Sequence, residues 1–209
     1  MIPTIYELSE GVEVHLYPDW IENPEAAFRE AEKLSWGPEV VTMYAKPSVI
    51  RRRTVDYGLG YTYNATAKPS VDWEPLPRKL QHKLEAQFGI DWPQCACNEY
   101  VDEDAYIGCH HDKDTVVDGE KREPLYIASI SLGAMRRMVL TPPGANLKVS
   151  MTVTGLMGVP GAVGIDLPSG SLLLFSNATN RTVTGWKHAV PKARKGEVGK
   201  RISLTYRHF

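Results

Sequence analysis

The sequence has few cysteines, no long apolar run and almost no net charge. Only three of its 209 residues are cysteines, and Cys95-Ala96-Cys97 lacks the spacing of a zinc pair. No apolar run approaches the roughly 20 residues that span a bilayer, and residues 1–7 lack the basic and apolar parts of a signal peptide. We therefore expect reduced cysteines in a cytoplasmic or nuclear protein that is neither secreted nor membrane-bound.

The length and the apolar pattern predict one mixed domain. A chain of 209 residues with 43% hydrophobic content can bury a single core. Helical patterns cover residues 23–34, with Pro24 in the first turn, and residues 73–88, which end at Gly89. Short strands follow, at residues 95–100, 126–132, 138–141, 147–153, 171–175 and 201–206. This order predicts an α+β, mainly β fold: a double-stranded β-helix (jelly-roll) core with N-terminal helices packed on one side.

A His-x-Asp pair with another histidine far downstream is the strongest sign of chemistry. Residues i and i+2 of an extended segment point to the same side, so His110 and Asp112 can face one ion, while His111 points away. His188 would come from a distant strand. Two histidines and one carboxylate leave half of an octahedral ion open, as in non-haem Fe(II) oxygenases, whereas structural zinc sites are closed by four ligands.

A strand that carries two arginines follows the last of these histidines. One face of this strand holds Arg201, Ser203, Thr205 and Arg207. A buried arginine is costly unless an anion meets it, and its planar guanidinium binds a carboxylate through two hydrogen bonds. Arg201 and Arg207 would lie about 20 Å apart along an ideal strand, so one small ligand reaches both only if their side chains converge. The strand suits a dicarboxylate co-substrate.

Taken in order, these motifs resemble the AlkB family of Fe(II)/2-oxoglutarate-dependent dioxygenases. The similar segments cover most of the chain, at residues 17–21, 57–63, 73–76, 98–100, 110–114, 127–133, 170–174, 186–192 and 201–207. The resemblance implies one dioxygenase domain over residues 1–209. Within it, residues 1–92 would form the helices and a substrate lid, and residues 93–209 the jelly-roll core.

The resemblance also implies a role for individual residues. Iron would be bound by His110, Asp112 and His188. The co-substrate 2-oxoglutarate would be bound by Asn98, Tyr100, Arg201, Ser203 and Arg207. Arg201 would pair with its distal carboxylate, helped by Tyr100. Asp114 stands where a family acid contacts the target base, with Lys113 beside it. Ser203 replaces the usual asparagine, and residues 142–166 look like an insertion.

The implied reaction uses Fe(II), 2-oxoglutarate and O2 to remove N-alkyl groups from nucleic-acid bases, in DNA repair or RNA demethylation. A target base must leave its stack, which costs least for a damaged or unpaired base. The best candidates for holding the substrate are Arg51, Arg52 and Arg53, just ahead of Tyr61 and Tyr63, which can stack on bases. We expect a monomer that acts on single-stranded, alkylated nucleic acid.

Two alternatives remain open. The net charge of −1 is not typical of a strong polyanion binder. Together with Ser203 and the insertion, it favours a hydroxylase of a small molecule or a protein side chain that uses the same iron site. A non-catalytic, metal-binding jelly-roll domain is the other alternative, and the intact ligand set together with Arg201 argues against it.

Overall fold

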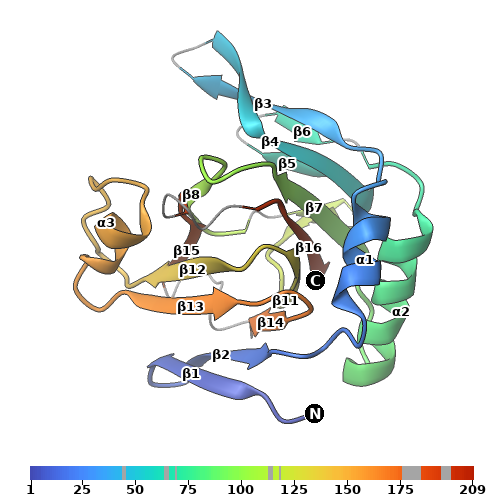
Figure 1. Ribbon diagram of the computed structural model, residues 1–209, viewed down its shortest axis with the longest axis horizontal. Coiled ribbons are helices and arrows are strands. Elements are labelled where there is room, and N and C mark those ends of the chain that lie inside the picture. Colours follow the sequence, from blue (N-terminus) through green and yellow to red (C-terminus); the bar gives the residue numbers. More distant parts are fainter. Residues whose placement is uncertain are drawn as a thin grey trace.

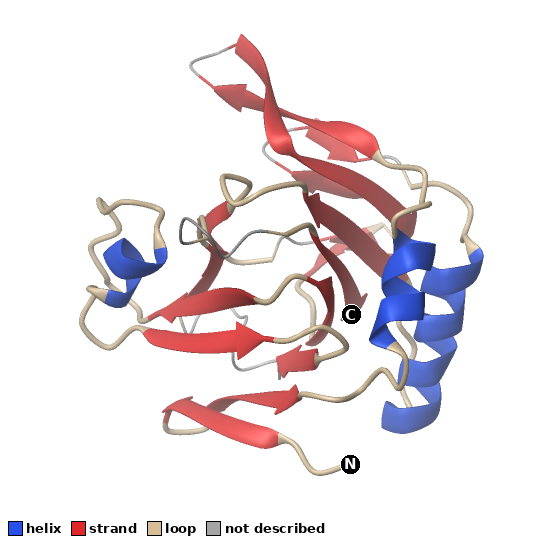
Figure 2. Ribbon diagram, viewed as in Figure 1, coloured by secondary structure: helices blue, strands red, loops and turns tan. Residues whose placement is uncertain are grey.

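The computed structural model describes residues 1–43, 46–63, 66–68, 70–112, 115–117, 119–175, 185–193 and 199–209. Two antiparallel sheets face each other, and two helices cover the outer side of the larger one (Figure 1). The helices are α1 (Pro24–Ala31), α2 (Pro75–Phe88) and the short α3 (Val153–Met157). Figure 2 shows α1 and α2 side by side at one end of a molecule built mainly from strands.

The large sheet has eight strands and the small sheet has four. In spatial order the large sheet consists of β1 (Thr4–Ser9), β2 (Val12–Tyr17), β14 (Leu172–Phe175), β11 (Tyr126–Gly133), β16 (Arg201–His208), β7 (Gln94–Tyr100), β4 (Lys46–Gly58) and β3 (Gly37–Met43). The small sheet consists of β13 (Val163–Leu167), β12 (Arg136–Thr141), β15 (Lys187–Val190) and β8 (Ile107–His110). Two hairpins complete the fold, β5 (Tyr61–Tyr63) with β6 (Thr66–Lys68) and β9 (Thr115–Val117) with β10 (Glu120–Arg122). Two facing antiparallel sheets form the jelly roll that the sequence predicts.

Both predicted helices are confirmed, but α1 ends at Ala31, three residues before the predicted end, and α2 begins at Pro75, two residues after the predicted start. Asn23 caps α1, since its side-chain oxygen accepts a hydrogen bond from the backbone N–H of Ala26 at 3.0 Å. Pro75 opens α2, where a missing N–H costs nothing. Gly89 ends α2 with a left-handed φ of 69°, and its N–H donates to the carbonyl of Glu85.

Each face of the large sheet contributes to a different apolar core. On one face Leu204 shares a core with Leu80 and Leu84 of α2. On the opposite face Leu173 shares a core with Leu140 of the small sheet. The large sheet is therefore buried on both sides, by the helices and by the small sheet. Its inner face is where a site can be enclosed.

Strand β16 has an apolar and a polar face. Ile202, Leu204 and Tyr206 lie in the core beneath the helices. Arg201 and Arg207 line a cavity between the two sheets. This arrangement confirms the predicted alternation, and it points the arginine side chains away from the helices.

The strand prediction for residues 147–153 is wrong. These residues form no strand, and α3 begins at Val153. Thr152 caps this helix by accepting a hydrogen bond from the N–H of Gly155 at 3.1 Å, and Asn146 accepts one from the N–H of Lys148. Such side-chain hydrogen bonds to the backbone compete with strand pairing. The other predicted strands are confirmed as β7, β11, β12, β14 and β16.

The first 92 residues hold six strands that the sequence analysis did not predict. In β4 the usual alternation is masked, because Arg52 is buried while its neighbours Arg51 and Arg53 are more exposed. Buried charges invert the pattern by which strands are recognised. Strands β1 to β4 extend the large sheet at both edges. Within the described residues, no helix is long and apolar enough to cross a bilayer.

Gly58, at the end of β4, is predicted to tolerate alanine less well than Gly89. Both glycines have a left-handed φ, at which any other residue costs about 1–2 kcal/mol. A Cβ at Gly58 would collide with the carbonyl oxygen of Pro93, whereas a Cβ at Gly89 meets nothing within 4 Å. Overpacking should make Gly58→Ala about 1–3 kcal/mol more destabilising than Gly89→Ala. Urea unfolding measures both variants, and equal losses of stability would contradict the prediction.

Candidate metal centre and co-substrate pocket

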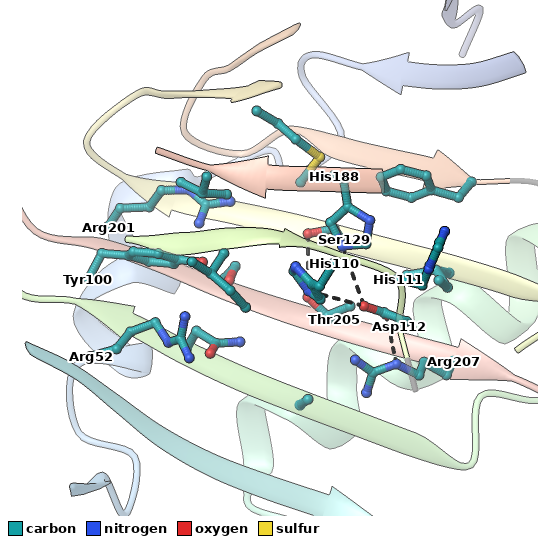
Figure 3. Close-up of a pocket in the computed structure, with 18 of the residues that line it drawn as sticks. Arg52, Tyr100, His110, His111, Asp112, Ser129, His188, Arg201, Thr205 and Arg207 are labelled. Carbon is teal, nitrogen blue, oxygen red and sulfur yellow. Dashed lines mark hydrogen bonds and ion pairs between the residues drawn. The ribbon is translucent and has the colours of Figure 1, made fainter. Parts of the chain in front are cut away.

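A cavity of about 70 Å³ lies between the two sheets. Residues that are far apart in the sequence line this cavity, as Figure 3 shows. The predicted site residues that line it are Arg52, Asn98, Tyr100, His110, Asp112, His188, Arg201, Ser203 and Arg207. The structure therefore brings together every residue that the sequence analysis assigned to iron or to 2-oxoglutarate.

Two histidines and one aspartate converge at one end of this cavity. His188 on β15 pairs in register with His110 on β8, so their rings lie with centroids 4.3 Å apart. Oδ1 of Asp112 lies 3.6 Å from Nε2 of His110 and 3.4 Å from Nε2 of His188. Among the described residues, this is the one group of three such side chains whose ligand atoms all lie within 4.8 Å of one another.

The environment sets the protonation of these side chains. The carbonyl of Gly108 lies 2.8 Å from Nδ1 of His110. Since a carbonyl only accepts, Nδ1 carries the proton and Nε2 keeps its lone pair. Burial, helped by His188, lowers the pKa of His110 to about 3, so the ring is neutral near pH 7. A neutral imidazole is the form that binds a metal ion.

Asp112 is held as a carboxylate. Burial by itself would raise its pKa, but Arg207 and then the two histidines lower the pKa well below its usual value. Nε of Arg207 donates to Oδ2 of Asp112 at 2.8 Å, and Nη1 of Arg207 donates to Gln94 at 2.9 Å. Oδ1 remains on the side of the histidines. One carboxylate oxygen is thus fixed by the arginine while the other faces the candidate metal position.

The donor set fits a divalent iron ion. Adjacent ligand atoms around an octahedral ion with bonds of about 2.1 Å lie about 3 Å apart. The two nitrogen–oxygen distances here, 3.4 and 3.6 Å, are close to that spacing. Two imidazoles and one carboxylate on one side are typical of non-haem Fe(II) sites with open positions.

Arg201 lies elsewhere on the cavity wall and has unused donors. Its side chain is 0% exposed. Nη2 donates to Oγ of Ser131 at 2.9 Å, and the guanidinium lies 5.0 Å from the ring centroid of Tyr100. Nε and Nη1 have no hydrogen-bond partner among the described residues. Burial lowers the pKa of Arg201, yet an arginine keeps its charge in proteins. A buried charge with two orphaned donors is costly, and a carboxylate of 2-oxoglutarate would satisfy both.

Comparison with known proteins agrees with this donor set. A sequence profile of the 2OG-Fe(II) oxygenase superfamily matches residues 13–207. The chain belongs to this superfamily. Its fold is AlkB-like, and its cofactors are Fe(II), 2-oxoglutarate and O2, as the resemblance implied.

Solved structures share the fold at low sequence identity. The structure of OsALKBH1, an AlkB homologue, gives a TM-score of 0.59 at 16% identity, covering 99% of this chain and 100% of that chain. An oxidoreductase of the 2OG-Fe(II) oxygenase family from Burkholderia pseudomallei gives 0.53 at 16% identity, covering 93% and 84%. A search of curated protein sequences gives no match.

Strand register explains how the candidate co-substrate residues of this oxygenase meet. On β16, Arg201 lies opposite Tyr100 of β7, and Ser203 lies opposite Asn98. All four side chains reach the cavity from neighbouring strands. Arg207 lines the same cavity near Asp112, at the other end from Arg201 in Figure 3. The two arginines therefore have different partners, and no single ligand needs to span them.

The three consecutive arginines of β4 point in different directions. Only Arg52 lines the cavity, where it donates to Glu39 at 2.9 Å. Arg51 pairs with Asp102 at 2.7 Å, and Arg53 pairs with the buried carboxylate of Glu99. Tyr61 and Tyr63 lie on β5, of which the structure describes only the backbone. Lys113 and Asp114 lie outside the described residues.

Sequence reasoning missed two buried residues near the site. Glu39 lines the cavity, but only its pairing with Arg52 across the β3–β4 hairpin reveals it. Arg136 lies 5.6 Å from the ring centroid of Tyr100 and donates through Nη2 to the carbonyls of Ala105 and Pro191 at 2.8 and 2.6 Å. It thereby joins the loop after β7 to the segment after β15. No local pattern distinguishes such an arginine from an exposed one.

Removal of either histidine is predicted to abolish metal binding. His110→Ala and His188→Ala each remove one of three donors, so Fe(II) affinity should fall by at least about 100-fold. His82→Ala, an exposed position on α2, serves as the control and should bind like the unmodified protein. Anaerobic calorimetry with Fe(II) measures all three. Unchanged affinity in both cavity variants would place the metal elsewhere.

Arg201→Lys is predicted to weaken 2-oxoglutarate binding while metal affinity stays the same. A lysine presents one compact charge and cannot reproduce the planar fork, and disrupting a buried charge pair costs about 2–5 kcal/mol, or roughly 30-fold and more in affinity. The KM for 2-oxoglutarate, followed by succinate formation, measures the effect. Arg137→Lys, at an arginine paired with Asp166 on the small sheet, is the matched control. An equal KM in both variants would contradict the assignment.

Proposed function

We propose that this oxygenase oxidatively removes N-alkyl groups from nucleic-acid bases. The observation that carries the proposal is a buried ion pair, Glu39 with Arg52, in the wall of the cavity that also holds the candidate metal ligands. A carboxylate accepts from the amino groups of bases and a guanidinium donates to their carbonyl and ring-nitrogen acceptors. This pair suits the edge of a flat, polar ring. The AlkB-like fold supports the same substrate class.

In the proposed mechanism the side chains of the chain hold and orient the reactants. His110, Asp112 and His188 would bind the iron, and Arg201 would orient 2-oxoglutarate through its distal carboxylate. Bound iron, 2-oxoglutarate and O2 supply the oxidation of an alkyl C–H bond, with succinate and CO2 as co-products. Arg207 keeps Asp112 ionised and fixed in position.

The rest of the cavity wall limits side reactions. Ile127 and Val190 are buried and Phe175 packs beside His188, with ring centroids 5.4 Å apart. These apolar side chains exclude water from the candidate metal position. The C–N bond of a hydroxylated N-methyl group then breaks: its electron pair stays on the base nitrogen, and the hydroxyl group loses its proton as formaldehyde leaves.

A hydroxylase of a small molecule or a protein side chain is the second candidate. It is favoured by the carboxylate partners of the β4 arginines, since Arg51, Arg52 and Arg53 each form an ion pair within the chain. Pairing reduces the positive charge available to a polyanion. The net charge of −1 acts in the same direction.

We further propose that residues 1–209 act as one domain. The large sheet supports this, because β1 to β4 share it with four strands from residues 93–209. The monomer and the cytoplasmic or nuclear location remain predictions from the sequence.

The proposed activity is tested with a single-stranded oligonucleotide that carries 1-methyladenine. The protein is loaded anaerobically with Fe(II) and 2-oxoglutarate and then exposed to O2. The oligonucleotide should lose the mass of one CH2 group, and with His110→Ala it should not. Mass spectrometry follows the oligonucleotide, and a parallel assay follows succinate and formaldehyde. Comparison of DNA with RNA identifies the preferred strand. Succinate formed with a methylated nucleoside or an amino acid, but with no oligonucleotide, would favour the second candidate.

A further inference from the structure

A surface groove of about 340 Å³ borders the cavity. Its walls come from residues 49–52 of β4, residues 104–108 around the start of β8, and Lys192. Arg52 and Ile107 line both the groove and the cavity, so the two spaces adjoin. The groove therefore lies beside the cavity, where the flanking part of an extended substrate could be held.

Tyr106 presents an exposed aromatic ring in this groove. The residue is 41% exposed, although its carbonyl accepts a hydrogen bond from Nη1 of the buried Arg52 at 3.1 Å. Nζ of Lys192 lies 5.7 Å from the ring centroid. A tyrosine held by its backbone offers a large contact surface at a small cost in conformational entropy. Such a ring is suited to stacking.

Two cations stand beside the ring. Arg51, with its side chain 59% exposed, lies 2.7 Å from Asp102 and 3.8 Å from Asp104. Lys192 lies 3.0 Å from the same Asp104. Exposed ion pairs of this kind contribute only about 0–1 kcal/mol. A phosphate can therefore compete for Arg51 and Lys192 at little cost. The groove thus combines a stacking surface with two exposed cations, for which a phosphate would compete with Asp102 and Asp104.

We propose that this groove binds the nucleotide next to the target base in a single strand. The base would stack on Tyr106, and its phosphate would contact Arg51 and Lys192, which is how proteins hold single strands irrespective of base identity. Exposed apolar Val49 offers a further contact. A paired base could not expose its face to Tyr106, so the groove selects unpaired strands. The inference rests on the proposed function and adds a second subsite to it.

Tyr106→Ala tests the stacking surface. Loss of one stacked base should lower the affinity for an unmodified single-stranded pentanucleotide by about 10- to 100-fold, measured by fluorescence anisotropy with the Fe(II)-loaded protein under anaerobic conditions. Tyr106→Phe should bind like the unmodified protein, since it keeps the ring. Tyr126→Ala, at a tyrosine 37% exposed on β11, is the matched control. Thermal unfolding checks that all variants are folded.

Substrate length distinguishes a flanking subsite from the catalytic cavity. For 1-methyladenosine monophosphate, Tyr106→Ala should leave kcat/KM unchanged, and for the methylated pentanucleotide it should lower kcat/KM by about 10- to 100-fold. An equal loss on both substrates would assign Tyr106 to the cavity and overturn the proposal.

Salt dependence tests the cations. Replacement of both cations, in the variant Arg51→Gln/Lys192→Gln, should reduce the slope of log affinity against log salt by about 0.7, the value for one phosphate of a single strand. Arg29→Gln on α1 is the control, because Arg29 is 60% exposed and pairs with Glu25 at 2.7 Å. Equal slopes in both variants would overturn the phosphate contact.

The binding measurements separate this inference from the proposed function. Binding of an unmodified pentanucleotide is measured without any reaction. If Tyr106→Ala does not weaken this binding, the groove proposal is wrong, even if demethylation is observed. If binding depends on Tyr106 but no demethylation is observed, the groove proposal is supported and only the proposed reaction is wrong. If a glutamate-rich peptide binds in a Tyr106-dependent way and the pentanucleotide does not, the occupant is a protein and the proposal is wrong.

Discussion

The ion pair between Asp112 and Arg207 is the interaction on which the site depends. Asp112 follows β8 of the small sheet and Arg207 lies on β16 of the large sheet, so the pair joins the two sheets across the cavity. A buried ion pair is tolerable only when its remaining hydrogen-bonding groups are satisfied. Gln94 binds the arginine, and the two histidines face the second carboxylate oxygen. The contacts that join the two sheets therefore also keep Asp112 ionised and hold its second oxygen toward the two histidines.

Buried arginines serve two different purposes in this fold. Arg52, Arg136 and Arg207 are bonded to carboxylates or carbonyls of the chain, and they fix strands and loops around the cavity. Nη2 of Arg201 donates to a serine hydroxyl and the guanidinium lies against the ring of Tyr100. Its Nε and Nη1 have no hydrogen-bond partner among the described residues, although Arg201 is the most deeply buried of the four. Native proteins leave such groups unsatisfied mainly where function requires it. A carboxylate of 2-oxoglutarate would satisfy the two unpaired donors of Arg201.

Arg52 connects the chemistry of the cavity to the surface. It pairs with Glu39 on the cavity wall and holds the backbone of Tyr106 in the adjoining groove. One guanidinium therefore contacts residues of both spaces, and its bond to Tyr106 uses the backbone carbonyl and not the side chain. The cavity of about 70 Å³ holds the candidate metal ligands, and the groove of about 340 Å³ beside it carries the exposed ring of Tyr106.

The sequence by itself determined features that depend on neighbouring residues. Asn23 and Gly89 mark helix ends through local hydrogen bonds, and the alternation along β16 separates polar from apolar side chains. The His-x-Asp spacing predicted that His110 and Asp112 lie together, because residues two apart on an extended chain point to the same side. His111, which the same rule turns away, nevertheless also lines the cavity.

Only the tertiary structure decided which polar residues are buried and what they meet. Of three adjacent arginines only Arg52 is buried, and the β3–β4 hairpin brings Glu39 to it. Thr152 caps helix α3 where residues 147–153 suggested a strand. These outcomes depend on pairing between distant strands, and strand preference is set by such neighbours more than by the residues themselves.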